Sequence, residues 1–196
     1  MSIAIIKYNA GNIRSVDCAL RRLGVEPVVT ADEETLRRAD RVIFPGVGEA
    51  ATTMDYLRTS GLDRVILSLK QPVLGICLGM QLMCRHSEEG DADGLGIFDA
   101  EVRRFASTRH EDKVPHMGWN TVSRICGPLF DGLGQEEYVY FVHSYYVPLH
   151  PCTAAVTDYI QPFSAALHKE NFYATQFHPE KSGSVGERIL HNFLTL

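Results

Sequence analysis

The first half of the chain alternates short apolar runs with segments in which apolar residues recur every three or four positions. A short apolar run predicts a buried strand, and the three-to-four spacing predicts a helix. Alternating strands and helices favour a mostly parallel sheet with helices on both faces. The predicted strands are residues 3–8, 25–29, 42–44 and 73–76, with helical segments between them and a further helix over 80–85.

Two of these helices carry recognisable start signals. Gly11 can turn the chain, and Asn12 can cap a helix whose apolar spacing continues until Gly24 ends it. Thr30 and Glu33 form a T-x-x-E pattern, which predicts a capping box for the next helix.

The second half is richer in strand-forming runs. The last two of these predict a hairpin across a Lys-Glu-Asn turn, and residues 185–194 have the spacing of an amphipathic helix. The predicted strands are 121–125, 139–143, 154–159, 163–167 and 173–177. With 196 residues, no linker and no repeat, the sequence predicts a single domain over 1–196: an α/β fold whose second half is β-rich.

Net charge and composition argue against several classes of function. The formal net charge of −5 argues against nucleic acid or an anionic membrane surface as a partner. The opening apolar run is too short for a secretory signal, and the longest stretch without charged residues, 138–157, contains two prolines and two histidines, so no membrane span is predicted. Five cysteines without a C-x-x-C pair predict a reducing, cytoplasmic compartment, and the histidine spacing indicates no metal site.

The sharpest chemical signal is Gly-Ile-Cys-Leu-Gly at residues 75–79. A strand runs directly into Cys77 and a helix follows, with glycines two positions before and after, as in a nucleophile elbow. Backbone N–H groups at a helix N-terminus favour a thiolate. The alternative is a small buried thiol between glycines that packing requires.

A cysteine nucleophile needs a base, and the base needs an orienting group. His178 and Glu180 point to the same side of an extended segment, and Pro179 between them favours that conformation. Alone, this pair also fits a solvated strand end; together with Cys77 it supplies all three roles.

A third element, Pro-Gly-Val-Gly at 45–48, follows a predicted buried strand. Glycines let a loop turn its N–H groups outward, as an oxyanion hole requires. The spacing of Gly46, Gly48 and Ala51 also matches a dinucleotide-binding fingerprint, but residues 66–71 lack the acidic residue that this motif needs about 20 positions on.

At this point the chain resembles a known family. Residues 75–81 (GICLGMQ) and 177–180 (FHPE) resemble the class I, triad glutamine amidotransferases, and 45–48 resembles their oxyanion strand. Within that family, Gly-Asn at 11–12, PHMGWN at 115–120, residues 138–145 and Lys-Ser at 181–182 resemble the glutaminase subunits of imidazole glycerol phosphate synthases. One departure is the opening: the family commonly has Asp-Tyr-Gly-x-Gly-Asn where residues 7–12 read Lys-Tyr-Asn-Ala-Gly-Asn, which affects expected interface contacts at this turn.

The resemblance implies roles for individual residues and no cofactor. Cys77 would attack the side-chain amide of glutamine, His178 would transfer protons, and Glu180 would orient His178. The oxyanion would be held by the N–H of Leu78 and by a loop N–H of Val47 or Gly48. The implied glutamine-binding residues are Gly46, Gln81, Ser144 and Tyr145, and the implied partner-interface residues are Asn12, Trp119 and Lys181.

The resemblance also implies a partner. Free ammonia is largely protonated in neutral water, so it must pass directly to a second active site, for which this chain has no room. The family's partner is a cyclase subunit with a (β/α)₈ barrel, which uses ammonia to make imidazole glycerol phosphate and a carboxamide ribonucleotide in histidine biosynthesis. The alternatives are an amidotransferase serving another synthase, such as anthranilate or aminodeoxychorismate synthase, and a non-catalytic α/β binding module.

Overall fold

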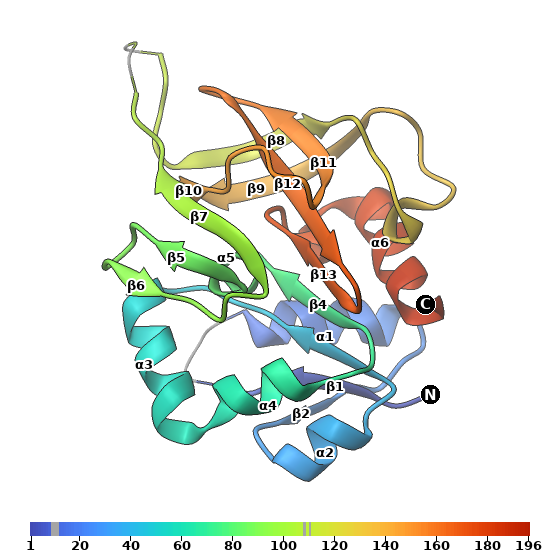
Figure 1. The fold of residues 1–196 in the computed structure, drawn as a ribbon. Helices are drawn as coiled ribbons and strands as arrows, with labels where there is room; N and C mark the ends of the chain where they lie inside the picture. Colours follow the sequence, from blue (N-terminus) through green and yellow to red (C-terminus); the bar gives the residue numbers. More distant parts are fainter. Residues whose placement is uncertain (9–11, 108, 110) are drawn as a thin grey trace.

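A computed structural model describes residues 1–8, 12–107, 109 and 111–196. Its centre is a seven-stranded sheet with the order β11-β12-β13-β4-β3-β1-β2 (Figure 1). The strands are β1 (Ile3–Ile6), β2 (Val28–Thr30), β3 (Arg41–Phe44), β4 (Val73–Ile76), β11 (Thr153–Asp158), β12 (Pro162–Lys169) and β13 (Phe172–Thr175). Every pairing from β2 through to β13 is parallel, and β11 and β12 extend the sheet in antiparallel pairing. The predicted mostly parallel sheet and its final hairpin are confirmed.

Helices cover both faces of this sheet, as the alternating pattern predicts. Because successive strand residues point to opposite faces, Ile3 and Ile5 pack with α1 and α6, whereas Ala4 and Ile6 pack with α2, α3 and α4. Two hydrophobic cores result, one on each face. The helices are α1 (Ile13–Arg22), α2 (Glu33–Arg38), α3 (Ala50–Ser60), α4 (Leu62–Ser68), α5 (Leu78–Leu82) and α6 (Gly183–Thr195), with short 3₁₀ helices η1 (Pro128–Phe130) and η2 (Pro179–Lys181).

Two smaller sheets lie beyond the carboxyl ends of the central strands (Figure 1). One has four short strands in the order β10-β7-β5-β6, and the other is an antiparallel pair, β8 with β9. Their strands are β5 (Cys84–Ser87), β6 (Ala92–Asp93), β7 (Phe98–Arg104), β8 (His116–Val122), β9 (Glu137–His143) and β10 (Tyr145–Tyr146). The sequence predicted β9 within two residues, but it missed β5, β6, β7 and β10.

Four local predictions were wrong. The strand predicted over 121–125 is displaced, because β8 runs from His116 to Val122. The helix predicted over 80–85 ends at Leu82, because the chain enters β5 at Cys84. The capping box at Thr30 does not form, because the cap of α2 is Asp32, whose carboxylate accepts a hydrogen bond from the Thr35 N–H at 2.8 Å. Asn12 lies at the start of α1 but makes no side-chain capping bond there; the turn predicted at Gly11 lies outside the described residues.

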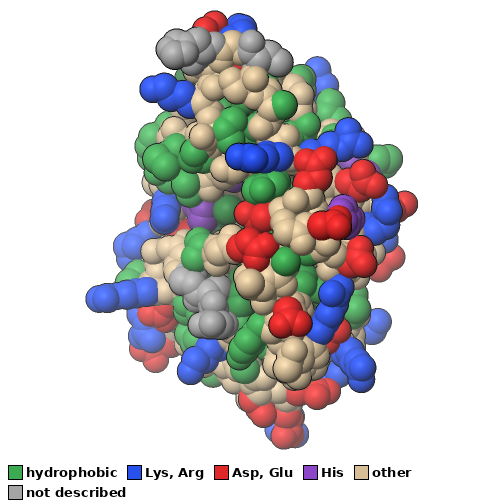
Figure 2. Space-filling model, turned by 90° about the vertical axis from the view of Figure 1, so that its left-hand side faces the viewer, with side chains coloured by type: hydrophobic (Ala, Val, Ile, Leu, Met, Phe, Trp, Pro, Cys, Tyr) green, Lys and Arg blue, Asp and Glu red, His purple; other side chains and the backbone are tan. Residues whose placement is uncertain are grey.

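The surface shown in Figure 2 carries basic and acidic side chains interspersed across the same face. Among the helices of the described residues, none combines the length and the apolar character that crossing a membrane requires. Nor do three His, Cys, Asp or Glu side chains gather anywhere in the described part of the chain in a way that could hold a metal ion.

Candidate active site

Cys77 stands on a strained turn between β4 and α5. Its backbone has φ 54° and ψ −108°, which is rare for a residue with a side chain. The flanking glycines make the turn possible: a Cβ on Gly79 would lie 2.0 Å from the Phe44 carbonyl oxygen, and one on Gly75 would lie 2.9 Å from the Met83 sulfur. The predicted strand–elbow–helix is confirmed, and the glycines serve both packing and the turn.

His178 reaches the elbow because its strand is the neighbour of β4. The Cys77 N–H donates to the Thr175 carbonyl at 2.7 Å, which ties the ends of β4 and β13 together. His178 is extended, with φ −99°, as the following Pro179 favours. Its Nδ1 lies 2.7 Å from Oε1 of Glu180, and both side chains are fully buried. The prediction that His178 and Glu180 lie side by side is confirmed, but the predicted extended segment is wrong, because Pro179–Lys181 form the 3₁₀ helix η2, which brings Glu180 back to His178.

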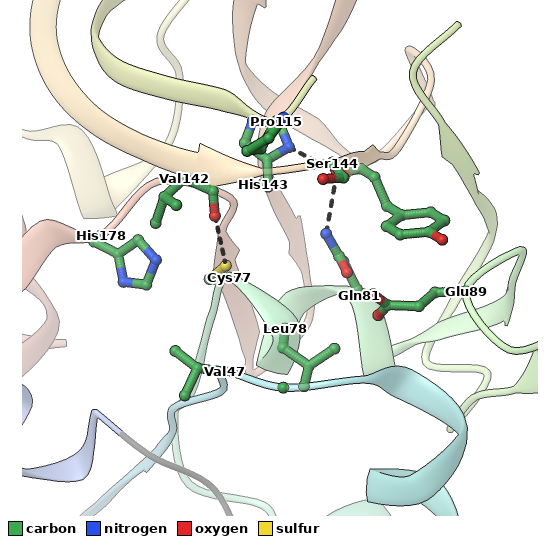
Figure 3. Close-up of a pocket in the computed structure, with 12 residues that line it drawn as sticks. Val47, Cys77, Leu78, Gln81, Glu89, Pro115, Val142, His143, Ser144 and His178 are labelled. Carbon is green, nitrogen blue, oxygen red and sulfur yellow. Dashed lines mark hydrogen bonds between the residues drawn. The ribbon is translucent and has the colours of Figure 1, made fainter. Parts of the chain in front are cut away.

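The electrostatics of His178 are set by burial and by two partners. Burial would lower the pKa of His178, but the Cys77 sulfur and the Glu180 carboxylate, through hydrogen bonding and charge, outweigh burial and raise it. The ring faces Cys77 (Figure 3), and Nε2 is buried without a hydrogen-bond partner among the described residues. The arrangement therefore favours a protonated imidazole beside the Cys77 sulfur.

Two further contacts hold the His–Glu pair in place. Asn12 Nδ2 donates to Glu180 Oε1 at 2.6 Å, so this residue, predicted at the partner interface, contacts the triad directly. Ser182, which is buried, donates from Oγ to the His178 carbonyl at 2.6 Å and accepts from the Tyr140 N–H at 3.0 Å. These bonds tie α1, η2 and β9 together around one imidazole.

A pocket of about 330 Å³ opens onto Cys77 (Figure 3). It brings together most of the predicted site residues and adds Glu89, Pro115, Val142 and His143. Its lining is Val47, Gly48, Cys77, Leu78, Gln81, Glu89, Pro115, Val142, His143, Ser144, Tyr145 and His178. Glu180 lies behind His178, and Gly46 is not among the lining residues.

Val47 and Gly48 of the loop at 45–48 line the pocket together with Leu78, and Figure 3 shows Val47 and Leu78 below Cys77. Leu78 is the first residue of α5, so its N–H has no partner within the helix. Gly48 has φ +124°, a conformation that favours glycine. Gly46 packs on the elbow instead: a Cβ there would lie 2.6 Å from the Gly79 nitrogen.

The predicted interface residues lie apart from the pocket lining. Trp119 is 56% exposed on β8, and Lys181 is exposed at the end of η2. Trp119 belongs to an apolar group on the outer face of the β8–β9 pair, together with Met117 (64% exposed) and Tyr138 (62%).

Sequence reasoning missed several site residues. Glu89 is the acidic side chain in the pocket lining, and its carboxylate accepts from the Ala50 N–H at 3.0 Å. It lies on a turn with no motif, so no local signal could have found it. His143 also lines the pocket and contacts His116. Gln176 contacts Cys77 from the interior, and the signal for it was its place two residues before His178.

The class of the protein follows from this geometry and from its relatives. The family model for class-I glutamine amidotransferases matches residues 4–196. A crystal structure of a glutamine amidotransferase superposes with a TM-score of 0.75 at 21% identity, covering 100% of this chain and 98% of that one, which shows a shared fold. The chain belongs to the class-I glutamine amidotransferases.

Its place within that family is equally definite. It is 69% identical over 196 residues to the imidazole glycerol phosphate synthase subunit HisH of Bacteroides thetaiotaomicron, with all of both chains covered. It is 46% identical over 198 aligned positions to the subunit of the same name in Escherichia coli K12, again over both entire chains. The chain is a member of the HisH subunits of imidazole glycerol phosphate synthase.

Proposed function

We propose that this chain hydrolyses glutamine to glutamate and ammonia, with Cys77 as nucleophile and His178 and Glu180 completing the triad. One observation carries the proposal: a cysteine held at φ 54° lines a pocket beside a buried His–Glu pair. The strained backbone presents the sulfur, and the pair supplies and orients a proton carrier.

The first half-reaction forms a thioester. The Cys77 thiolate attacks the side-chain amide carbon of glutamine, and the carbonyl electrons move to oxygen. The N–H groups of Leu78 and of Val47 or Gly48 would hold that oxyanion, and losing one such donor typically costs ~10²–10³ in rate. The C–N bond then breaks as His178 Nε2 protonates the nitrogen, so that ammonia leaves.

The second half-reaction regenerates the thiolate. Water adds to the thioester carbon and gives a proton to His178 Nε2. The C–S bond breaks, its electron pair stays on sulfur, and glutamate leaves. Glu180 stabilises the imidazolium in both halves through the 2.7 Å contact with Nδ1.

We assign glutamine binding to the other residues that line the pocket. Glu89 provides a negative charge for the α-ammonium group of glutamine. Gln81, Ser144 and Tyr145 line the same pocket and provide polar atoms for the rest of the substrate, as the resemblance implied. Gly46 contributes by letting the loop pack closely on the elbow.

The acceptor of ammonia is the other subunit of the synthase, and we infer that it is a cyclase with a (β/α)₈ barrel. The exposed apolar group of Met117, Trp119 and Tyr138 supports a docking face on the β8–β9 pair. Lys181 and Asn12 are the polar candidates for the same heterodimer contact. The five cysteines are all free thiols, which supports a reducing, cytoplasmic location.

A glutamine analogue that carries a chloroketone tests the proposal. Mass spectrometry of the labelled complex should find the adduct on Cys77, while the exposed Cys18 and Cys126 stay unmodified at stoichiometric reagent. Excess glutamine should protect Cys77. Labelling mainly on another thiol, or labelling of Cys77 that glutamine does not reduce, would contradict the assignment.

A further inference from the structure

A chain of buried amide groups connects the pocket wall to the sulfur of Cys77. Gln81 Nε2 lies 3.1 Å from the Tyr145 carbonyl oxygen and 2.9 Å from Oε1 of Gln176. Gln176 Nε2 in turn lies 3.7 Å from the Cys77 sulfur. Gln81 is 4% exposed and Gln176 is fully buried, so these amides satisfy each other rather than water.

Elementary hydrogen-bond chemistry fixes the orientation of both amides. A backbone carbonyl can only accept, so the Gln81 atom beside Tyr145 has to be the NH₂ group. That NH₂ group donates its second hydrogen to Gln176, which must therefore present its oxygen. The Gln176 atom that faces Cys77 is consequently its NH₂ group, a donor.

The other neighbours of the sulfur make this donor significant. The Val142 carbonyl lies 3.9 Å from the sulfur and can accept a hydrogen bond from the thiol, but it offers nothing to a thiolate. Gln176 does the reverse, because its N–H stabilises a negative sulfur. It does so from the protein interior, since Gln176 is not among the residues that line the pocket.

The backbone holds this donor rigidly against the nucleophile. The Gln176 N–H donates to the Ala165 carbonyl at 2.8 Å, and the preceding residue, Thr175, accepts from the Cys77 N–H at 2.7 Å. Both glutamine and cysteine therefore follow directly from the paired ends of β13 and β4. A side chain anchored in this way keeps its donor in place without reorganisation during the reaction.

We propose that Gln176 is a further catalytic residue, which donates a hydrogen bond to the Cys77 thiolate and is held in the donating orientation by Gln81. The role rests on the glutaminase function proposed above. Sulfur carries its negative charge before attack and again when the C–S bond of the thioester breaks. Gln176 thus increases the fraction of thiolate in the resting site and stabilises the departing thiolate when glutamate is released.

The test compares the native chain with Gln176→Met, which removes the amide at similar length. Iodoacetamide alkylation of Cys77, followed over pH by peptide mass spectrometry, measures the thiolate without glutamine or partner. We expect the alkylation profile of Gln176→Met to move up by about one pH unit, which is a tenfold loss of thiolate on the rising limb. Gln176→Glu, nearly isosteric but lacking the donor, should move it in the same direction and further.

Two controls separate this effect from a general disturbance. Cys18, exposed in the same molecules, should keep its alkylation profile, and Gln161→Met, at an exposed glutamine, should leave Cys77 unchanged. If Gln176→Met fails to fold, as judged by circular dichroism, the Gln176→Glu variant decides the question. Profiles of Cys77 that superimpose on the native one in the folded variants would overturn the proposal.

In the assembled synthase the same variants should slow glutamine turnover about tenfold and raise the fraction of glutamyl-thioester found after acid quenching. A normal thioester fraction at reduced turnover would contradict the proposed role in thiolate departure. If the native complex released no glutamate at all, the glutaminase proposal would fail, while the alkylation comparison would still decide whether Gln176 supports the thiolate.

Discussion

The two faces of β9 belong to one strand but differ in how far their side chains are exposed. Toward the interior, Val139, Phe141 and His143 are buried, and His143 reaches the pocket. Toward the outside, Tyr138 is 62% exposed and lies diagonally across from Trp119 of β8, and Met117 lies two residues before Trp119 on the same face. The inner face is therefore buried and carries one polar side chain, His143, to the pocket, whereas the outer face leaves large apolar side chains exposed.

This difference separates the part of the chain that carries the candidate site from the face that we propose for assembly. On the inner side, the buried amides of Gln81 and Gln176 bond to each other, and the buried His178 ring contacts Glu180 through Nδ1. On the outer side, Trp119 contacts Tyr140 but stays 56% exposed, and Met117 and Tyr138 are exposed as well. The inner face holds the groups of the candidate site, and the outer face is the one that we propose for contact with the second subunit.

The largest effect expected on the inner face is that of Cys77→Ala. It should reduce glutamine hydrolysis by at least ~10⁴-fold, because the covalent route is lost. The ammonia-dependent reaction of the assembled synthase should stay at the native rate, since the outer face and the acceptor site are intact. Glutamate release and product formation from added ammonium salt measure the two activities. Cys18→Ser, at an exposed thiol, is the matched control. A comparable loss of glutamine hydrolysis in this variant would contradict the role of Cys77 as nucleophile.

On the outer face, Trp119→Ala should weaken assembly without affecting the fold. Truncating a central aromatic residue of an interface costs about 2 kcal/mol, roughly 30-fold in affinity. The free energy of unfolding of the isolated chain should change by less than about 0.5 kcal/mol, because the ring is exposed. Titration calorimetry with the other subunit of the synthase measures the affinity. Tyr56→Ala, at a 39% exposed aromatic residue on α3, should bind normally, and equal weakening by both would refute a docking role for this face.

The smallest expected effect concerns two buried histidines of the inner face and the way in which the free energy of unfolding depends on pH. Burial lowers the pKa of His116 to about 4 and of His143 to about 3, and their rings are 3.0 Å apart, from Nδ1 of His116 to Nε2 of His143. Since both are neutral when folded, their contribution to stability is complete above pH 6.5 and is lost as the pH falls. Each group should cost about 1.4 kcal/mol at pH 5.5.

Urea unfolding at pH 7.5 and 5.5 tests this for His116→Phe. The stability difference between the two pH values should shrink by about 1.4 kcal/mol relative to the native chain. His178, whose pKa is raised, acts in the opposite direction but is common to both proteins and cancels. His191→Gln, at an exposed histidine on α6, should keep the native difference. If His116→Phe kept the native difference in stability between the two pH values, the conclusion that His116 and His143 are buried in the neutral form would be wrong.

Patterns that repeat along the chain made the central sheet predictable. Strand 73–76 was correct to the residue, because a buried parallel strand is a continuous apolar run. In the small sheet, β5, Cys-Arg-His-Ser, was missed because it has neither an apolar run nor alternation, and only its pairing with β6 and β7 makes it a strand. β7 does alternate, with Phe98, Ala100 and Val102 buried, so the sequence carried a signal for this strand that the prediction did not use. The box at Thr30 failed because Asp32 competes for the same cap and is nearer to the helix.

The site residues also fall into two groups, those that the sequence predicted and those that it did not. Cys77, His178 and Glu180 could be predicted because their chemistry imposes short-range spacing on the sequence. Glu89 could not, because it meets the pocket only through the placement of its turn against α3. Asn12 was assigned to the interface, yet its contact with Glu180 joins residues 168 positions apart, a separation that no local pattern encodes.

The backbone of Cys77 has a consequence for how this protein can be improved. A side chain held in a sparsely populated conformation costs on the order of 1–3 kcal/mol, and glycine would relieve it. A search for heat-resistant variants that scores only the folded fraction would therefore favour replacing the proposed nucleophile. Thermal endurance and turnover compete at this single position, so any such search has to select for both.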